Sequence, residues 1–138
     1  MSCVFRIAGN HLDVDALASS SPLTHYRLDR LGERRTPRCR ANMADYQDSC
    51  AHYSVSQQDF ASLQLQVAGA IQFLLVHGEA LRAMLRIPGI QGSSLDFGIE
   101  RRNVFVQADL LPAALLSPVG ALGIDIELSH YPAGDEDQ

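Results

Sequence analysis

The sequence contains no lysine, and all eleven of its basic residues are arginines. Such a bias is best explained by the base composition of the source genome, so a single arginine is weak evidence for anion recognition even though guanidinium groups suit that work. Acidic residues outnumber the arginines and give a formal net charge of −5. Because phosphate binding depends on clustered positive charge, this balance disfavours a nucleic-acid partner.

Cysteines are few and show no paired spacing. Cys3, Cys39 and Cys50 form no CxxC motif and leave an odd count. A disulfide framework is not expected in a chain whose hydrophobic residues, 46% of the total, suffice for a core of its own. Cys39, Cys50 and His52 do not match the usual zinc spacings, so we predict neither a metal site nor a cofactor.

Long apolar runs are absent. The longest uncharged one, Val67 to Val76, includes Gln72 and falls well short of the roughly 20 residues that span a bilayer. The first residues also lack the basic start, apolar middle and small-residue cleavage site of a secretory signal. We therefore predict a cytoplasmic protein without a membrane segment.

Catalytic signatures are absent as well. The sequence has no GxSxG, HExxH, P-loop or GxGxxG motif. Its five histidines are scattered, and nothing in the sequence orients any of them toward a nucleophile. A protein without enzymatic activity is favoured.

Alternation of apolar and polar residues predicts the strands. Such alternation is typical of strands half-buried on one face of a sheet. We predict strands at 3–9, 51–56, 95–99, 104–106 and 124–128, and a short one at 25–28. The segment 100–103 is predicted to be a hairpin turn between two of them.

Apolar residues at helical spacing predict a long helix over 57–86. Ser56 is its predicted cap and Gly78 a break within it, while Gln66 is predicted to face away from the sheet. A short helix over 16–19 should be capped by Asp13 or Asp15.

A third helix is predicted near the end of the chain. Asp109 should cap it, Pro112 should occupy its first turn, Pro118 should disturb it, and Gly123 should end it.

Together these elements predict an α+β fold. We expect one two-layer domain over residues 3–131, with a mainly antiparallel sheet of five or six strands and helices packed on one face. The first part has the strand-helix-strand-strand-helix-strand order of a ferredoxin-like unit. Residues 132–138 should form a frayed acidic tail.

Several of these markers together resemble a known family. They are Phe5-Arg6-Ile7-Ala8-Gly9-x-x-Leu12-Asp13-Val14-Asp15-x-Leu17, Pro22, the long helix, and Leu111-Pro112 to Gly123-Ile124-Asp125-Ile126-Glu127 and Tyr131. Over about residues 3 to 131 the chain resembles the bacterial domain of unknown function called DUF4279. The resemblance implies a small α+β domain and brings no catalytic residues. The chain departs from the family at Tyr53, where members often have Trp, and at Pro118.

The strongest candidate site is a charged sheet face. If the apolar positions of the strands face the helices, period two places the charged ones together on the opposite face: Arg6, Asp96, Glu100, Asp125 and Glu127. Such a face is either an ordinary solvated surface with cross-strand ion pairs or a surface for a basic partner, a cation or another copy of the chain.

Arginines also cluster between positions 27 and 40. The cluster includes Arg27, Arg30, Arg34 and Arg35, with Asp29 and Glu33 between them. It is either a solvated loop or a docking patch for an acidic partner or RNA.

From these features we expect a non-enzymatic protein-binding domain, similar in size and charge to immunity proteins that neutralise toxins. The alternative is a small enzyme or ligand-binding protein whose site lies beside the Arg-rich loop, at His11, Asp13, Asp15 and His25.

Finally, the sequence predicts a homodimer. The predicted strand Val104-Phe105-Val106 is apolar on both faces and has no charge or proline to block edge pairing. Phe105 should lie on the face of Arg6 and Glu127 and be covered by a second subunit.

Overall fold

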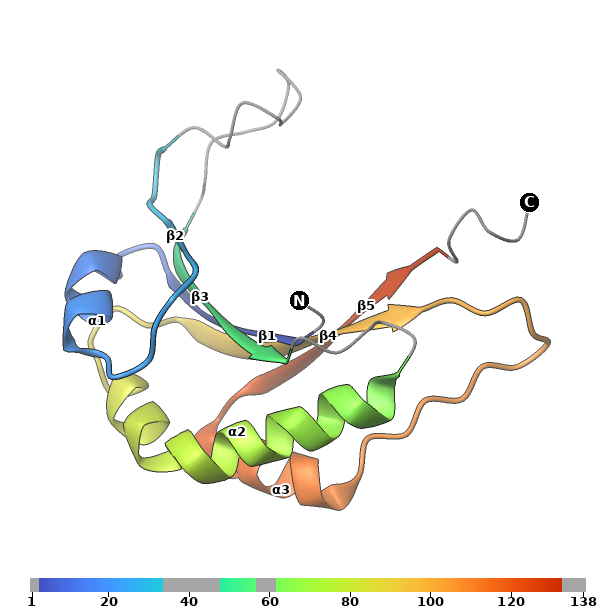
Figure 1. Cartoon of the computed structure of the whole chain (residues 1–138). Coiled ribbons are helices and arrows are strands. Elements are labelled where there is room, and N and C mark those ends of the chain that lie inside the picture. Colours follow the sequence, from blue (N-terminus) through green and yellow to red (C-terminus); the bar gives the residue numbers. More distant parts are fainter. Residues whose placement is uncertain (1–2, 34–47, 57–61, 133–138) are drawn as a thin grey trace.

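The computed structural model describes residues 3–33, 48–56 and 62–132. Within these ranges the chain has three helices and one open five-stranded sheet, which is mixed but mostly antiparallel (Figure 1). The predicted α+β class is confirmed. Arg34, Arg35 and positions 133–138 of the predicted tail lie outside the described residues.

The first strand occupies the centre of the sheet. β1 (Cys3–Gly9) pairs antiparallel with β3 (Ser49–Ser56) on one side and with β4 (Gly92–Glu100) on the other. β2 (Arg27–Asp29) is antiparallel to β3, and β5 (Asp125–Tyr131) is parallel to β4. The order is therefore β2-β3-β1-β4-β5, with β2 and β5 at the two edges.

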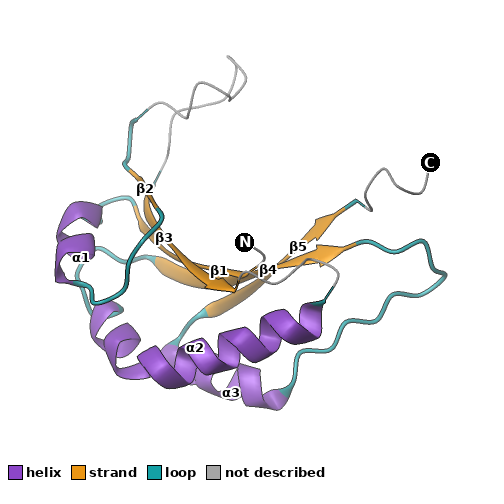
Figure 2. Ribbon diagram, in the orientation of Figure 1, coloured by secondary structure: helices purple, strands orange, loops and turns teal. Residues whose placement is uncertain are grey.

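Helices cover one face of this sheet. α2 (Leu63–Met84) and α3 (Ala113–Leu122) lie below the strands in Figure 2, and α1 (Val14–Ser20) lies at the left end of the sheet. No helix among the described residues covers the opposite face. The core between the layers contains fully buried side chains from both, among them Phe5, Ile7, Leu17, Tyr53, Leu81, Leu95, Phe97 and Leu115. None of the described helices has the length and apolarity needed to cross a membrane.

Two helix ends agree with the sequence prediction. The Asp13 carboxylate accepts a hydrogen bond from the Ala16 amide at 3.0 Å and caps α1. Gly123 ends α3 at φ 71°, in the left-handed conformation that glycine adopts without strain.

Other helix predictions were wrong. Ser56 belongs to β3, and Ser62 caps α2 by accepting from the Leu65 amide at 3.3 Å; residues 57–61 lie outside the described ranges. Gly78 does not break α2, because a single glycine costs a helix only about 1 kcal/mol. At α3, Pro112 rather than Asp109 occupies the cap position.

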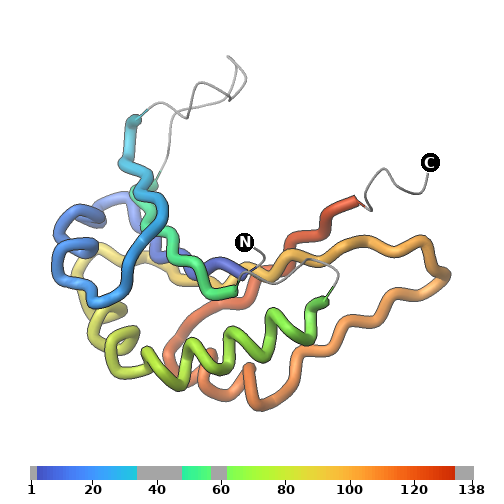
Figure 3. The backbone as a smooth tube through the Cα atoms, viewed as in Figure 1, coloured from blue at the N-terminus to red at the C-terminus, as the bar shows by residue number. Residues whose placement is uncertain are grey.

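The predicted hairpin does not form. Val104, Phe105 and Val106 belong to a loop, 101–112, which projects from the end of β4 and returns to α3 (Figure 3). The place beside β4 is taken by β5, whose parallel pairing requires the long crossover through α3. Phe105 is therefore fully exposed on a loop, and the free sheet edge on this side belongs to β5.

Gln66 is also placed differently from the prediction. It is completely buried, and its Nε2 donates to the carbonyl of Gly98 at 2.8 Å. Nε2 of Gln107 likewise donates to the carbonyl of Glu100 at 3.0 Å. Both bonds satisfy main-chain groups of β4 where this strand extends past the end of β1, since β1 has no residue paired beyond Phe97.

Candidate functional site

The uncovered face of the sheet carries a charged network that we call the open-face network. Its members are Arg27 and Asp29 from β2, His52 from β3, Arg6 from β1, Asp96 from β4, and Glu127 and Ser129 from β5. The strand register places these side chains on one face of the sheet, because alternate residues of a strand share a face. Some neighbours are directly opposite each other and others are diagonal, and hydrogen bonds join them into one row across the sheet. All five strands contribute.

Arg6 is the centre of this row. Its Nη1 donates to Asp96 Oδ2 at 2.7 Å and lies 3.8 Å from Glu127 Oε2, and its Nε donates to His52 Nδ1 at 3.2 Å. Asp96 Oδ1 accepts a further bond from the Ser129 hydroxyl at 2.6 Å. The Arg6 side chain is 31% exposed and that of Asp96 only 11%, so the pair is held by contacts on several sides.

His52 continues the row toward the other edge. Its Nε2 lies 2.7 Å from Asp29 Oδ2, and Arg27 Nε donates to Asp29 Oδ1 at 2.8 Å. Because Arg6 donates to Nδ1, the neutral ring carries its hydrogen on Nε2 and donates it to Asp29. Tyr26 packs on the same imidazole, with ring centroids 5.9 Å apart.

Burial and charge fix the protonation of these groups. Burial lowers the pKa of His52, and the charges of Arg27 and Arg6 add to this effect against the opposing hydrogen bond that His52 donates to Asp29. Burial alone would raise the pKa of Asp29, but bonds from Arg27 and His52 outweigh it and lower that pKa. Burial and then the nearby Asp29 raise the pKa of the Cys50 thiol, on the same face, to about 11.

At neutral pH the network therefore holds a neutral histidine with both nitrogens engaged, and the neighbouring thiol is protonated. Neither group is prepared to act as a general base or a nucleophile. The arrangement fixes charges in place, which suits recognition.

The network also has a charge gradient. Two arginines, Arg6 and Arg27, share this face with five carboxylates: Asp29, Asp96, Glu100, Asp125 and Glu127. The surplus lies toward β4 and β5, where the Glu127 side chain is 59% exposed. The predicted placement of Arg6, Asp96, Glu100, Asp125 and Glu127 on one face agrees with this register.

His52 and Asp29 were not predicted as members of the site. From the sequence, His52 was considered only as a zinc ligand and rejected, and Asp29 was noted only as an acidic residue within the arginine cluster. The alternation of β3 would have placed His52 on the correct face, but its contact with Arg6 depends on the β1–β3 register, which one sequence does not reveal.

The described part of the Arg-rich loop is engaged with carboxylates. Arg30 makes a two-pronged contact with Asp15, at 2.6 and 3.0 Å, and lies 3.8 Å from Glu33. Arg27 is paired with Asp29 as above. A docking role for the whole loop stays a prediction, because Arg34 and Arg35 lie outside the described residues.

The two carboxylates of the alternative site, Asp13 and Asp15, have structural roles. Asp13 caps α1, and Asp15 holds Arg30. Two cavities among the described residues lie along α2, and neither is lined by His11, Asp13, Asp15 or His25.

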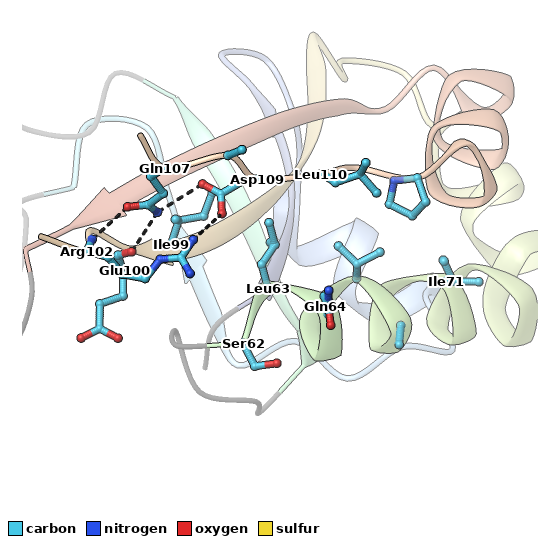
Figure 4. Close-up of a pocket in the computed structure, with 14 residues that line it drawn as sticks. Ser62, Leu63, Gln64, Ile71, Ile99, Glu100, Arg102, Gln107, Asp109 and Leu110 are labelled. Atoms are coloured by element: carbon cyan, nitrogen blue, oxygen red, sulfur yellow. Dashed lines mark hydrogen bonds and ion pairs between the residues drawn. The ribbon is translucent and has the colours of Figure 1, made fainter. Parts of the chain in front are cut away.

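The larger cavity lies elsewhere, between α2 and the loop 101–112, and has a volume of about 590 Å³ (Figure 4). Its apolar wall includes Leu63, Ile71 and Ile99. At one end Gln107 Nε2 donates to Asp109 at 3.2 Å, and Arg102 Nη2 lies 3.9 Å from the same carboxylate. Its size is within the usual range for small-molecule sites. We call this cavity the α2 groove.

Comparison of the chain with protein-family models, with curated proteins and with solved structures found no match. The resemblance to DUF4279 therefore stays a prediction.

The pKa shifts predict that acid weakens the fold. Because the native pKa of His52 lies below its ordinary value of 6.5, the unfolded chain binds the proton first as the pH falls. We expect a lower free energy of unfolding at about pH 5 than at about pH 7.5, measured by urea denaturation. Asp29, whose pKa is lowered from 3.8, adds to this loss only below about pH 4.

The variant His52→Gln keeps a donor toward Asp29 but cannot titrate. It should show a smaller loss between the two pH values than the wild type, because the other four histidines are the same in both proteins. Equal losses would show that His52 is not responsible.

Proposed function

We propose that this chain is a non-enzymatic protein-binding domain and that the open-face network contacts a basic segment of its partner. The observation that carries the proposal is one charged row, held across all five strands on a face that no described helix covers, with surplus carboxylates at the β4–β5 side. An uncovered sheet face with fixed charge offers a partner a complementary potential.

Fixed geometry favours this use. The Arg6 guanidinium is tied to Asp96 and His52, so a partner would not have to order it on binding. Glu127 and Asp125 are exposed beside it and supply the negative field. Charge complementarity of this kind gives fast and specific association, as in the small acidic immunity proteins to which we compare this domain.

Small-ligand binding is the second candidate function. It is supported by the α2 groove, whose apolar wall ends in Arg102, Gln107 and Asp109, rather than by the site predicted from sequence. An elongated molecule with one hydrogen-bonding end would fit such a cavity.

We further propose that β1 to β4 form a ferredoxin-like unit to which α3 and β5 are added. The order β2-β3-β1-β4 and the antiparallel pairing of these strands support this reading.

The partner experiment compares two variants that reverse the same charge. Wild-type protein, Glu127→Arg and Glu79→Arg are immobilised and exposed to a lysate of the source organism at about 0.05 M and about 0.5 M salt. Glu127 is on the open face, whereas Glu79 is exposed on α2. We expect a protein partner that binds wild type and Glu79→Arg alike, is released by salt, and binds Glu127→Arg about tenfold more weakly.

The variant Ala68→Phe tests the second candidate function, the binding of a small ligand in the α2 groove. Ala68 is exposed and lines the α2 groove, so phenylalanine would fill it at small cost to the fold. Loss of the bound molecule on Ala68→Phe, with Glu127→Arg unaffected, would place the function in the α2 groove. Equal binding by all four proteins would contradict the open-face proposal.

A further inference from the structure

The outer edge of the sheet at β5 is built to pair with another strand. No described strand lies beyond β5, and five of its seven residues are exposed. The carbonyl of Tyr131 accepts from the Arg101 amide at 2.8 Å, so main-chain groups of Tyr131 point toward β4. Because main-chain groups alternate in direction along a strand, those of Ile126, Leu128 and His130 point away from the sheet.

Most of the usual protection of an edge is missing over these residues. Natural edges are blunted by proline, by a bulge, by very short length or by charged side chains, and of these β5 has only the carboxylates of Asp125 and Glu127. β5 has seven residues with no proline, and its pairing with β4 runs without a register shift. The other edge strand, β2, has only three residues.

We propose that β5 pairs antiparallel with β5 of a second copy, about a twofold axis at Leu128, so that two sheets join into one. In this register Leu128 faces Leu128 of the other copy, and Ile126 faces His130. These are the residues whose main-chain groups point outward, so the pairing makes about six main-chain hydrogen bonds.

Side chains favour the same register. Leu128, on the helix side and 39% exposed, would be covered by its own copy. On the open face Glu127 would lie opposite Ser129, and Asp125 opposite Tyr131, so no carboxylate lies directly opposite another. A shift centred on Glu127 would instead put two carboxylates directly opposite each other, which is destabilising, and would make fewer main-chain bonds. The strand is therefore self-complementary in one register.

This interface differs from the one that the sequence suggested. Phe105 is on the projecting loop and takes no part in it. The inference is also independent of the proposed function, because the open face stays uncovered in the joined sheet.

The test begins with the mass of the protein in solution. Light scattering at about 0.15 M salt, where repulsion between two copies of net charge −5 is screened, should give twice the 15.1 kDa of one chain. Leu128→Arg places two like charges at the axis and should give a monomer at the same concentration. Leu75→Arg, at an exposed leucine of α2, and Phe105→Arg should stay dimeric.

A second measurement does not depend on the variants folding. In a mixed sample of differently labelled copies, an intermolecular NOE is expected between the Hα protons of Glu127 and Ser129, which would face each other at about 4.5 Å between Cα atoms. A monomeric wild type at high concentration would overturn the proposal. A dimer that lacks this NOE would also overturn it. So would a dimer that dissociates in Phe105→Arg or Leu75→Arg but persists in Leu128→Arg.

Discussion

Replacing Arg6 with methionine is expected to lower the free energy of unfolding by about 3 kcal/mol. The change leaves Asp96, whose side chain is only 11% exposed, without its cation, and it removes the donor to His52 Nδ1. The Asp96 carboxylate would keep the hydrogen bond from Ser129 but lose the one from Arg6 together with its compensating charge. Urea denaturation at neutral pH measures the loss.

Arg30→Met is the matched control. Arg30 also makes a close pair, 2.6 Å from Asp15, but its side chain is 43% exposed and that of Asp15 61%. Water replaces such a partner easily, so we expect a much smaller loss than for Arg6→Met. If the two variants were equally stable, the open-face network would be no more than a set of surface ion pairs.

Replacing Gly9 with alanine is expected to destabilise the fold by about 3 kcal/mol or more. A Cβ atom at Gly9 would lie 2.0 Å from the carbonyl oxygen of Gly89, a main-chain atom that cannot move away as a flexible side chain can. The end of β1 and the turn after α2 would have to separate. Urea denaturation or thermal unfolding measures the change.

The same substitution of glycine by alanine in α2 should raise the free energy of unfolding instead of lowering it. At Gly78 an added Cβ atom meets nothing within 4 Å, and alanine favours the helix over glycine. Gly78→Ala should therefore stabilise the protein by about 0.5 to 1 kcal/mol. Destabilisation by both variants would show that close approach to Gly89 is not the reason for the loss at Gly9.

Period-two patterns predicted the strands well where the strands are long. The alternation in 3–9, 51–56, 95–99 and 124–128 placed strands that the structure contains and put Arg6, Asp96 and Glu127 on one face. These assignments succeed because a buried face forces the pattern on every second residue.

The same reasoning failed at Val104–Val106. Three alternating residues are too few to predict a strand, because tertiary contacts decide whether so short a segment pairs. Here β5 occupies the place beside β4, and Gln107 holds the loop through hydrogen bonds with the main chain of Arg102 and Glu100. The burial of Gln66 was missed for a related reason. Its partner is a carbonyl 32 positions away, and a glutamine in a helix gives no local sign of such a contact.

The bond between Arg6 and Asp96 joins residues 90 positions apart. β1 is made before the other four strands of this sheet, yet it occupies the centre of the sheet and must wait for β3 and then β4 before both of its sides are paired. Domains dominated by such distant contacts fold slowly, because chain closure precedes any gain from the contacts. The charged row is complete only when β5 has joined, so the surface that we propose for binding appears only after all five strands have been made. A nascent chain that stops before β5 would not display it.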